Sequence, residues 1–279
     1  MAADDVADFE FDKVEVDETL SNSTKSVASG VDSGSTKERS YHNFAESVYP
    51  LPNDEAEQKR LELQHRIWQL SLRDHSHLAP LSCSPLSALD IGCGPGMWVL
   101  DFAHQYPDCK VTGMDLSSTW PDQSQIPANA EFKVGDFVAR WTYLHRFDYI
   151  HSRAVGTGIK LWATLLHRCF ENLEPGGWRE FQEFQFPLIT DDDTLELCPA
   201  FKSWALTWAM GMSKVGTNID SVLQVPEMLR ERGLLNVTHK SGKWPMGPWA
   251  SKQGTRLDSE KQLGEMMEVV SDYLRMPKY

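Results

Sequence analysis

The stretch Leu89-Asp90-Ile91-Gly92-Cys93-Gly94-Pro95-Gly96 decides how the rest of the sequence is interpreted. Its apolar start predicts a buried parallel strand, and its glycines predict a tight turn. The residues Met97 to Ala103 follow with helical spacing. Small residues let a ligand come close to the backbone, and the free N–H groups at a helix start favour a negative group. A strand, a glycine turn and a helix in this order therefore predict a cofactor-binding cradle.

The spacing of the glycines separates two classes of cofactor. A dinucleotide fingerprint, G-x-G-x-x-G, would need its third glycine at position 97, which is Met97, whereas the glycine comes one residue earlier. The G-x-G-x-G spacing resembles motif I of the class I S-adenosylmethionine-dependent methyltransferases. That resemblance implies that Asp90 and the glycines face the methionine end of the cofactor. The cofactor-binding residues that we predict in this stretch are Asp90, Gly92, Cys93, Gly94 and Gly96. A tight turn without a ligand is the alternative.

Two acids follow the next two predicted strands. Residues 109–116 form the second predicted strand, closed by Asp115 and Leu116, and an acid there accepts hydrogen bonds from ribose hydroxyls. A helix-capping role is the alternative for Asp115. Residues 130–134 form the third predicted strand. After it, the resemblance implies that Asp136 accepts from the adenine amino group and that Phe137 backs the ring. A dinucleotide site does not require Asp136, so the two acids favour S-adenosylmethionine over NAD.

Two candidate bases lie at the ends of the fourth and fifth predicted strands, residues 147–151 and 178–184. Ligands of a parallel sheet bind beyond the carboxyl ends of its strands. His151 is therefore expected near the methyl donor, and Glu183 could act as a base at the far end of its strand. Polar residues in a central strand break the usual apolar pattern, and such breaks are expected at functional sites. A core histidine and a solvent-facing strand end are the alternatives.

The segment before the glycine turn sharpens the resemblance. Asp54 can cap a helix, with Glu57 three residues on. The segments that resemble the N-terminal entry of the fungal LaeA-like methyltransferases are 39–42, 49–55 and 60–65. That family implies a helix packed over the cofactor mouth, with Tyr49 and the turn at 53–55 closing the site. From the residues alone, this helix is an amphipathic cover for a sheet edge.

The remainder of the chain completes the expected fold. The fold class is α/β, a Rossmann-like methyltransferase sheet with helices on both faces, an extra N-terminal helix and a helical lid. Helical spacing predicts an apolar core helix at 161–173, the lid or a core helix at 201–212, and a helix at 225–233. A sixth strand is predicted at 234–240. The resemblance ends near residue 265, without the last antiparallel strand that the family has.

Composition bounds the cellular setting. The chain has 279 residues with a net charge of −13, which argues against direct nucleic-acid binding. Residues 1–38 are expected to be a disordered acidic and Ser-rich tail, either solvating or binding a protein partner, ahead of a domain at 39–279. The five cysteines include no C-x-x-C, which favours free thiols in a reducing compartment. Neither a signal peptide nor a membrane span is predicted, so a cytoplasmic or nuclear location is expected.

These observations predict a methyltransferase that modifies a small molecule of fungal secondary metabolism. No metal site is predicted, because the His75-x-His77 pair has no further ligand at a workable spacing. The main alternative, also implied by the resemblance, is a regulatory protein that acts in a nuclear complex. A truncated, inactive product is a third interpretation. A nicotinamide oxidoreductase is disfavoured by Met97 and Asp136.

Overall fold

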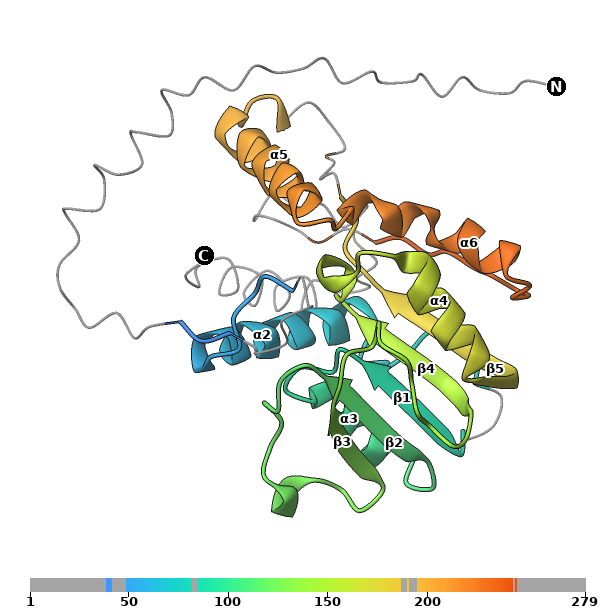
Figure 1. Ribbon diagram of the computed structural model, residues 1–279. Coiled ribbons are helices and arrows are strands. Elements are labelled where there is room, and N and C mark those ends of the chain that lie inside the picture. The colour runs from blue at the N-terminus through green and yellow to red at the C-terminus, as the bar shows by residue number, and fades with distance from the viewer. Residues whose placement is uncertain are drawn as a thin grey trace. The chain divides into compact units, whose positions relative to one another are not determined.

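The structure is a computed structural model that describes residues 39–41, 49–81, 85–186, 190, 195–242 and 244 (Figure 1). These residues belong to one compact unit, Arg39–Tyr279. The tail expected at residues 1–38 lies outside the described residues. No described helix is long and apolar enough to cross a membrane.

A parallel sheet of five strands forms the centre of this unit, in the order β3-β2-β1-β4-β5. The strands are β1 (Ser87–Ile91), β2 (Lys110–Asp115), β3 (Ala130–Val134), β4 (Phe147–Arg153) and β5 (Leu173–Gln182). The strand order reverses between β1 and β4. Ligands bind in the crevice outside the carboxyl ends of the strands at such a reversal. The predicted α/β class is confirmed, and the fold places the glycine turn after β1 at this crevice.

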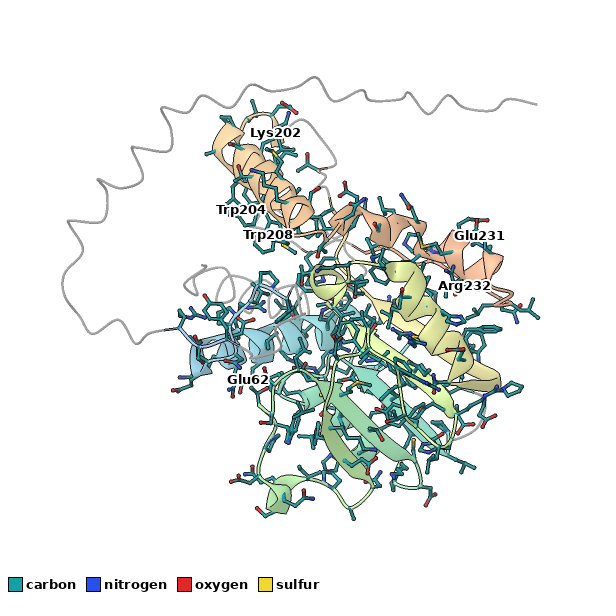
Figure 2. All side chains as sticks on the ribbon, in the orientation of Figure 1. Glu62, Lys202, Trp204, Trp208, Glu231 and Arg232 are labelled. Atoms are coloured by element: carbon teal, nitrogen blue, oxygen red, sulfur yellow. The ribbon has the colours of Figure 1, made fainter. Side chains whose placement is uncertain are left out.

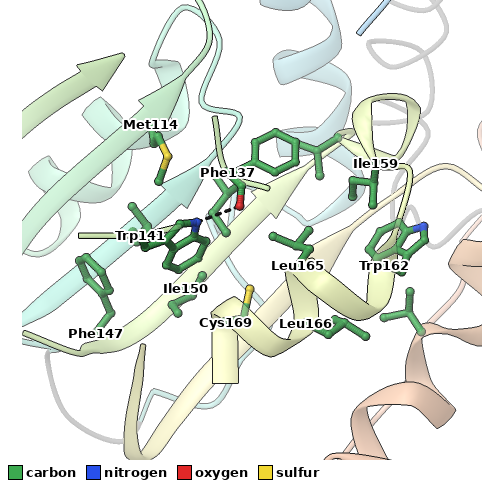
Figure 3. Packing of buried hydrophobic residues seen from close by; sticks show 14 of the residues in the cluster. Met114, Phe137, Trp141, Phe147, Ile150, Ile159, Trp162, Leu165, Leu166 and Cys169 are labelled. Carbon is green, nitrogen blue, oxygen red and sulfur yellow. Dashed lines mark hydrogen bonds between the residues drawn. The ribbon is translucent and has the colours of Figure 1, made fainter. Parts of the chain in front are cut away.

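Helices cover both faces of the sheet because side chains alternate along each strand. On one face, α3 (Met97–Gln105) packs Trp98, Val99 and Phe102 against strand residues such as Ala88. On the other face, the helices are α4 (Trp162–Glu171) and α6 (Val225–Glu231). Figure 3 shows this second cluster, in which Leu165 and Leu166 of α4 meet Ile150 of β4. Burying one such leucine contributes about 1.5–3 kcal/mol to folding.

The N-terminal helix α2 (Glu55–Ser71) begins as predicted. Asp54 is its N-cap, and the Asp54 carboxylate accepts a hydrogen bond from the Glu57 amide at 3.1 Å. The Glu57 carboxylate also pairs with Arg60 one turn later, and both side chains are buried. The cap predicted from the sequence is therefore formed, and Glu57 in addition neutralises a charge inside the helix.

The C-terminal part differs from the prediction in one element. Its helices are α5 (Pro199–Lys214), the short η4 (Ile219–Gln224) and α6, while η1 (Gln123–Gln125) and η2 (Gly156–Gly158) lie earlier in the chain. Gly233 ends α6 with a φ of 83°, as expected. The sixth strand predicted at 234–240 is wrong, because that segment contains no strand. Leu234 and Val237 instead pack against the cluster beneath α4. Their apolar side chains are therefore partly buried against the core without forming a strand.

The predicted lid helix forms as α5, and most of its apolar surface is exposed. Met212 is its one buried residue, whereas Trp204 and Met210 are about half exposed. Trp204 and Trp208 lie along the same side of the helix (Figure 2). Phe201 stacks on Trp204 with ring centroids 5.7 Å apart. The helix is therefore not a core helix in the described part of the chain, and its role as a lid stays a prediction.

Candidate active site

The turn after β1 depends on three glycines in the left-handed region. The φ angles of Gly92, Gly94 and Gly96 are 67°, 52° and 85°. The amides of Gly92 and Cys93 both donate to the carbonyl oxygen of Met114 in β2, at 2.8 and 3.1 Å. Left-handed backbone costs other residues roughly 1–2 kcal/mol. The turn therefore needs glycine on conformational grounds, and it joins the carboxyl ends of β1 and β2.

Only one of these glycines could carry a Cβ without a clash. A Cβ at Gly92 would lie 2.5 Å from Cγ1 of Val155, and a Cβ at Gly96 would lie 2.5 Å from Cε1 of Phe132. At Gly94 the nearest atom would be Cδ1 of Leu61, at an ordinary contact distance of 3.6 Å. Side chains therefore crowd Gly92 and Gly96, whereas Gly94 is the least crowded glycine of the turn.

Asp115 at the end of β2 is fixed beside Gly94. Its Oδ2 accepts the amide of Gly94 at 2.9 Å, and its Oδ1 accepts the amide of Ser117 at 3.0 Å. Burial raises the pKa of Asp115, while those two amides act in the opposite direction. An ionised carboxylate has about four acceptor positions, so these two amides do not occupy all of them. Leu116, which follows, is partly buried. The structure thus brings the predicted ribose acid to the glycine turn.

Phe137 and Tyr49 lie close to the same glycine, Gly158. Phe137 is 7% exposed, and its carbonyl oxygen accepts the indole N–H of Trp141 at 2.8 Å (Figure 3). A Cβ at Gly158 would lie 3.4 Å from Tyr49 Cδ2 and 3.7 Å from Phe137 Cζ. Two rings from distant parts of the sequence therefore approach the same glycine. Asp136, beside Phe137, accepts the amide of Val138 at 2.9 Å.

Helix α2 spans the carboxyl ends of the sheet. At its start, Asn53 Nδ2 donates to Ser117 Oγ at 3.1 Å, just after β2. Leu61 then lies against the glycine turn after β1. The later contacts, to β4 and to the residues after β5, are His65 with Arg153 and Trp68 with Phe184. The helix thus covers the mouth of the predicted cofactor site, as the resemblance implied.

The two candidate bases have different surroundings. His151 is fully buried, stacks on Trp98 with ring centroids 3.9 Å apart, and has its Nδ1 2.8 Å from Oδ1 of Asp90. Burial lowers the pKa of His151 well below its ordinary range. Glu183 follows β5, and it accepts the amides of Val155 and Gly156 at 2.9 and 3.3 Å. Burial raises the pKa of Glu183 to about 7, so this carboxylate can exchange a proton near neutral pH.

The polar residues of β5 include one with a clear structural role. Glu180 accepts the backbone amides of Leu78 and Ala79, at 2.8 Å from Oε2 in each case, and the hydroxyl of Tyr149 at 3.1 Å. It therefore anchors the segment between α2 and β1. His77 in this segment contacts Tyr106 and Ala79 through its two ring nitrogens.

Comparison with known proteins identifies the family. A family model for a methyltransferase domain matches residues 58–239, which include the glycine turn, both acids and both candidate bases. The chain belongs to this methyltransferase family. The cofactor of the family is S-adenosylmethionine, in agreement with the glycine spacing.

The relatives include a fungal methyltransferase and a fungal regulator of secondary metabolism. Over 232 residues the chain is 34% identical to the methyltransferase pytC of Aspergillus terreus, covering 83% of this chain and 69% of that one. It is 34% identical over 215 residues to the secondary metabolism regulator laeA of Aspergillus niger, covering 76% of this chain and 56% of that one. Among solved structures, the plantazolicin methyltransferase BpumL matches at 14% identity and a TM-score of 0.46, covering 80% of this chain and 83% of that chain.

The sequence pattern predicted the glycine turn, but it did not indicate the residues that contact the turn from other elements. Val155 closes Gly92, and Arg153 and His65 join the helix α2 to the sheet. Arg153 comes two residues after His151, but its partner on a helix almost ninety positions earlier has no signal in local spacing. The roles in cofactor binding and catalysis stay predictions for all the candidate site residues. These are Tyr49, Asp90, Gly92, Cys93, Gly94, Gly96, Asp115, Leu116, Asp136, Phe137, His151 and Glu183.

Proposed function

We propose that this methyltransferase transfers the methyl group of S-adenosylmethionine to a small molecule of fungal secondary metabolism. The observation that carries the proposal is the hydrogen bond from the Gly94 amide to Asp115. It places a fixed carboxylate beside the least crowded glycine of the turn. The similarity to the methyltransferase pytC supports the activity, and the similarity to the secondary metabolism regulator laeA supports the link to secondary metabolism.

The chain's own residues would hold the reactants in the following way. The bound cofactor supplies an electrophilic methyl group on a sulfonium. Asp115 accepts from the ribose hydroxyls, and the rings of Tyr49 and Phe137 exclude water from the crevice. The protein accelerates the reaction mainly by aligning the acceptor atom of the substrate with the methyl group.

A hydroxyl or amine acceptor must also lose a proton. We assign this step first to Glu183, whose pKa of about 7 matches a base that works near neutral pH. The proton of the acceptor would move to a carboxylate oxygen of Glu183. His151 is the second candidate, and its burial and low pKa make it the weaker base.

The test compares cofactor binding and methyl transfer in the wild type and in Gly94→Asp. The matched control is Gly176→Asp, because Gly176 also has a left-handed φ, 84°, with open space around it, but lies in β5 away from the crevice. We expect Gly94→Asp to lose cofactor binding, measured by calorimetry, and Gly176→Asp to keep it. Equal binding in the wild type and Gly94→Asp would remove the basis for the proposed site.

A second function is favoured by the similarity to the laeA regulator. In this alternative, the protein binds the cofactor and acts within a nuclear complex, and the acidic segment at residues 1–38 contacts a protein partner. Copurification of a transcriptional complex together with cofactor binding, but without turnover of small molecules, would favour it. Small-molecule methylation by the isolated protein would favour the enzyme. The cytoplasm is the location that we propose for the enzyme, and the nucleus for the regulator.

A further inference from the structure

His65 connects three elements of the fold through one side chain. It lies on α2, and its Nε2 is 2.9 Å from Oδ2 of Asp101 on α3. Its Nδ1 is 3.0 Å from Nη1 of Arg153, the last residue of β4. The His65 side chain is 13% exposed, whereas that of Asp101 is 46% exposed, so the bond to Arg153 is the better shielded of the two.

The two partners determine where the ring carries its proton. A guanidinium has only donors, so Nδ1 of His65 must accept from Arg153. A carboxylate has only acceptors when it is ionised, so Nε2 must donate to Asp101. These two bonds therefore require the neutral ring with its proton on Nε2. A doubly protonated ring would direct an N–H group at the N–H group of Arg153.

Both partners are themselves held in place. Arg153 donates from Nε to Oε1 of Gln182 at 2.7 Å, and its guanidinium lies 5.6 Å from the centre of the Trp68 ring. Gln69 donates to Oδ2 of Asp101 at 2.9 Å. Burial alone would raise the pKa of Asp101, but the hydrogen bonds from His65 and Gln69 hold it below its usual range. The geometry around His65 is therefore fixed from α2, α3 and the sheet.

A cavity of about 260 Å³ adjoins this group. Its lining includes His65, Asp101 and Arg153. The other titratable side chains that line it are Asp74 and His75 after α2 and His104 on α3.

The position of His65 on α2 links this group to the cofactor cradle. Leu61 is one helical turn before His65, and its side chain lies closest to the Cβ position of Gly94. Residues four apart share a face of a helix. Fixing His65 between α3 and β4 therefore also fixes Leu61 above the glycine turn.

We propose that His65 is a positioning residue that holds α2 over the cofactor crevice through its two ring hydrogen bonds, so that cofactor binding weakens when they are lost. This inference rests on the proposed function, because it assumes that the crevice binds S-adenosylmethionine.

Three variants separate the loss of the two hydrogen bonds from the loss of the imidazole ring. In His65→Gln, the amide can accept from Arg153 and donate to Asp101. In His65→Leu, both bonds are lost. His104→Gln is the matched control, because His104 lines the same cavity while its ring bonds only to the Leu100 carbonyl of its own helix in the described structure.

The first measurement is the dissociation constant of S-adenosylmethionine by calorimetry, with all proteins at the same pH. The loss of one hydrogen bond changes affinity by roughly two- to tenfold. We expect His104→Gln to bind like the wild type, His65→Gln to keep most of the affinity, and His65→Leu to bind more weakly by about this factor or more. Equal affinity of His65→Leu and the wild type would overturn the proposal.

The second measurement needs no cofactor. Amide hydrogen exchange of α2 is compared between variants at the same pH, so that the intrinsic exchange rate cancels. Faster exchange in His65→Leu than in His65→Gln would support the proposal, and equal exchange would overturn it. If neither the wild type nor any variant binds S-adenosylmethionine, the proposed function fails, while hydrogen exchange still tests the role of His65. If His65→Leu does not fold, the comparison of the wild type with His65→Gln decides.

Discussion

Oδ1 of Asp90 lies 2.8 Å from Nδ1 of His151, and both side chains are closed off from solvent. The two residues are neighbours in register on β1 and β4, and the Trp98 ring covers the imidazole. Burial raises the pKa of Asp90 to about 7, although Arg153 and Arg179 act in the opposite direction. The motif I carboxylate thus faces a buried histidine, on the side of the sheet that α3 covers.

This pair predicts a pH-dependent stability that Asp90→Asn removes. A carboxyl whose folded pKa lies above its unfolded value of 3.8 stabilises the fold fully below pH 3.8 and loses that contribution as the pH rises through about 7. We expect the melting temperature of the wild type to fall between about pH 5 and pH 8 more than that of Asp90→Asn. The pKa of Glu183 is also raised, but its contribution is common to both proteins. Parallel pH profiles would contradict this prediction.

Gly96 and Gly233 allow the effect of crowding to be separated from that of backbone strain. Their φ angles are 85° and 83°, but a Cβ at Gly96 would meet the Phe132 ring at 2.5 Å, whereas Gly233 has nothing within 4 Å. We expect Gly233→Ala to cost about 1 kcal/mol and Gly96→Ala to cost about 1–3 kcal/mol more. Urea unfolding measures both free energies. Equal losses would show that the Phe132 ring moves aside at little cost.

Asn53→Ala tests whether the start of α2 closes the cofactor site. Asn53 donates to Ser117 Oγ, and the amide of Ser117 in turn holds Asp115. Losing one such bond should raise the dissociation constant of S-adenosylmethionine by about two- to tenfold. The control is Lys59→Ala, which removes only an exposed pair with Glu55. An unchanged affinity in Asn53→Ala would mean that this end of α2 does not support the site.

Glu183→Gln tests the assigned base. Because the carboxylate must be ionised to accept a proton, the wild-type rate should rise with pH through about 7, the pKa of Glu183. The variant should lose about 100-fold or more of this rate. Its amide oxygen can still accept from Val155, so cofactor affinity, measured separately, should change by much less. If the variant keeps the rate and its pH profile, the proton leaves by another route.

The local patterns of the sequence were sufficient for the strands and the glycine turn. The five predicted strands and the helices between them are present because each depends on the order of apolar residues within a short segment. The sixth strand was predicted from a local pattern of apolar residues, and that prediction was wrong. Leu234 and Val237 pack against the apolar cluster beneath α4 and do not pair with the sheet.

The sequence by itself determined the α/β class, the cradle around Gly94 and the acid at Asp115, because conformational demands on glycine and hydrogen-bonding chemistry are properties of single residues and their near neighbours. Only the tertiary structure decided that His151 faces Asp90 in the interior and that His65 joins Asp101 to Arg153. Those contacts arise when the strand order brings β1 and β4 together and α2 crosses their ends. They depend on packing between segments that are far apart in the chain, which no local spacing encodes.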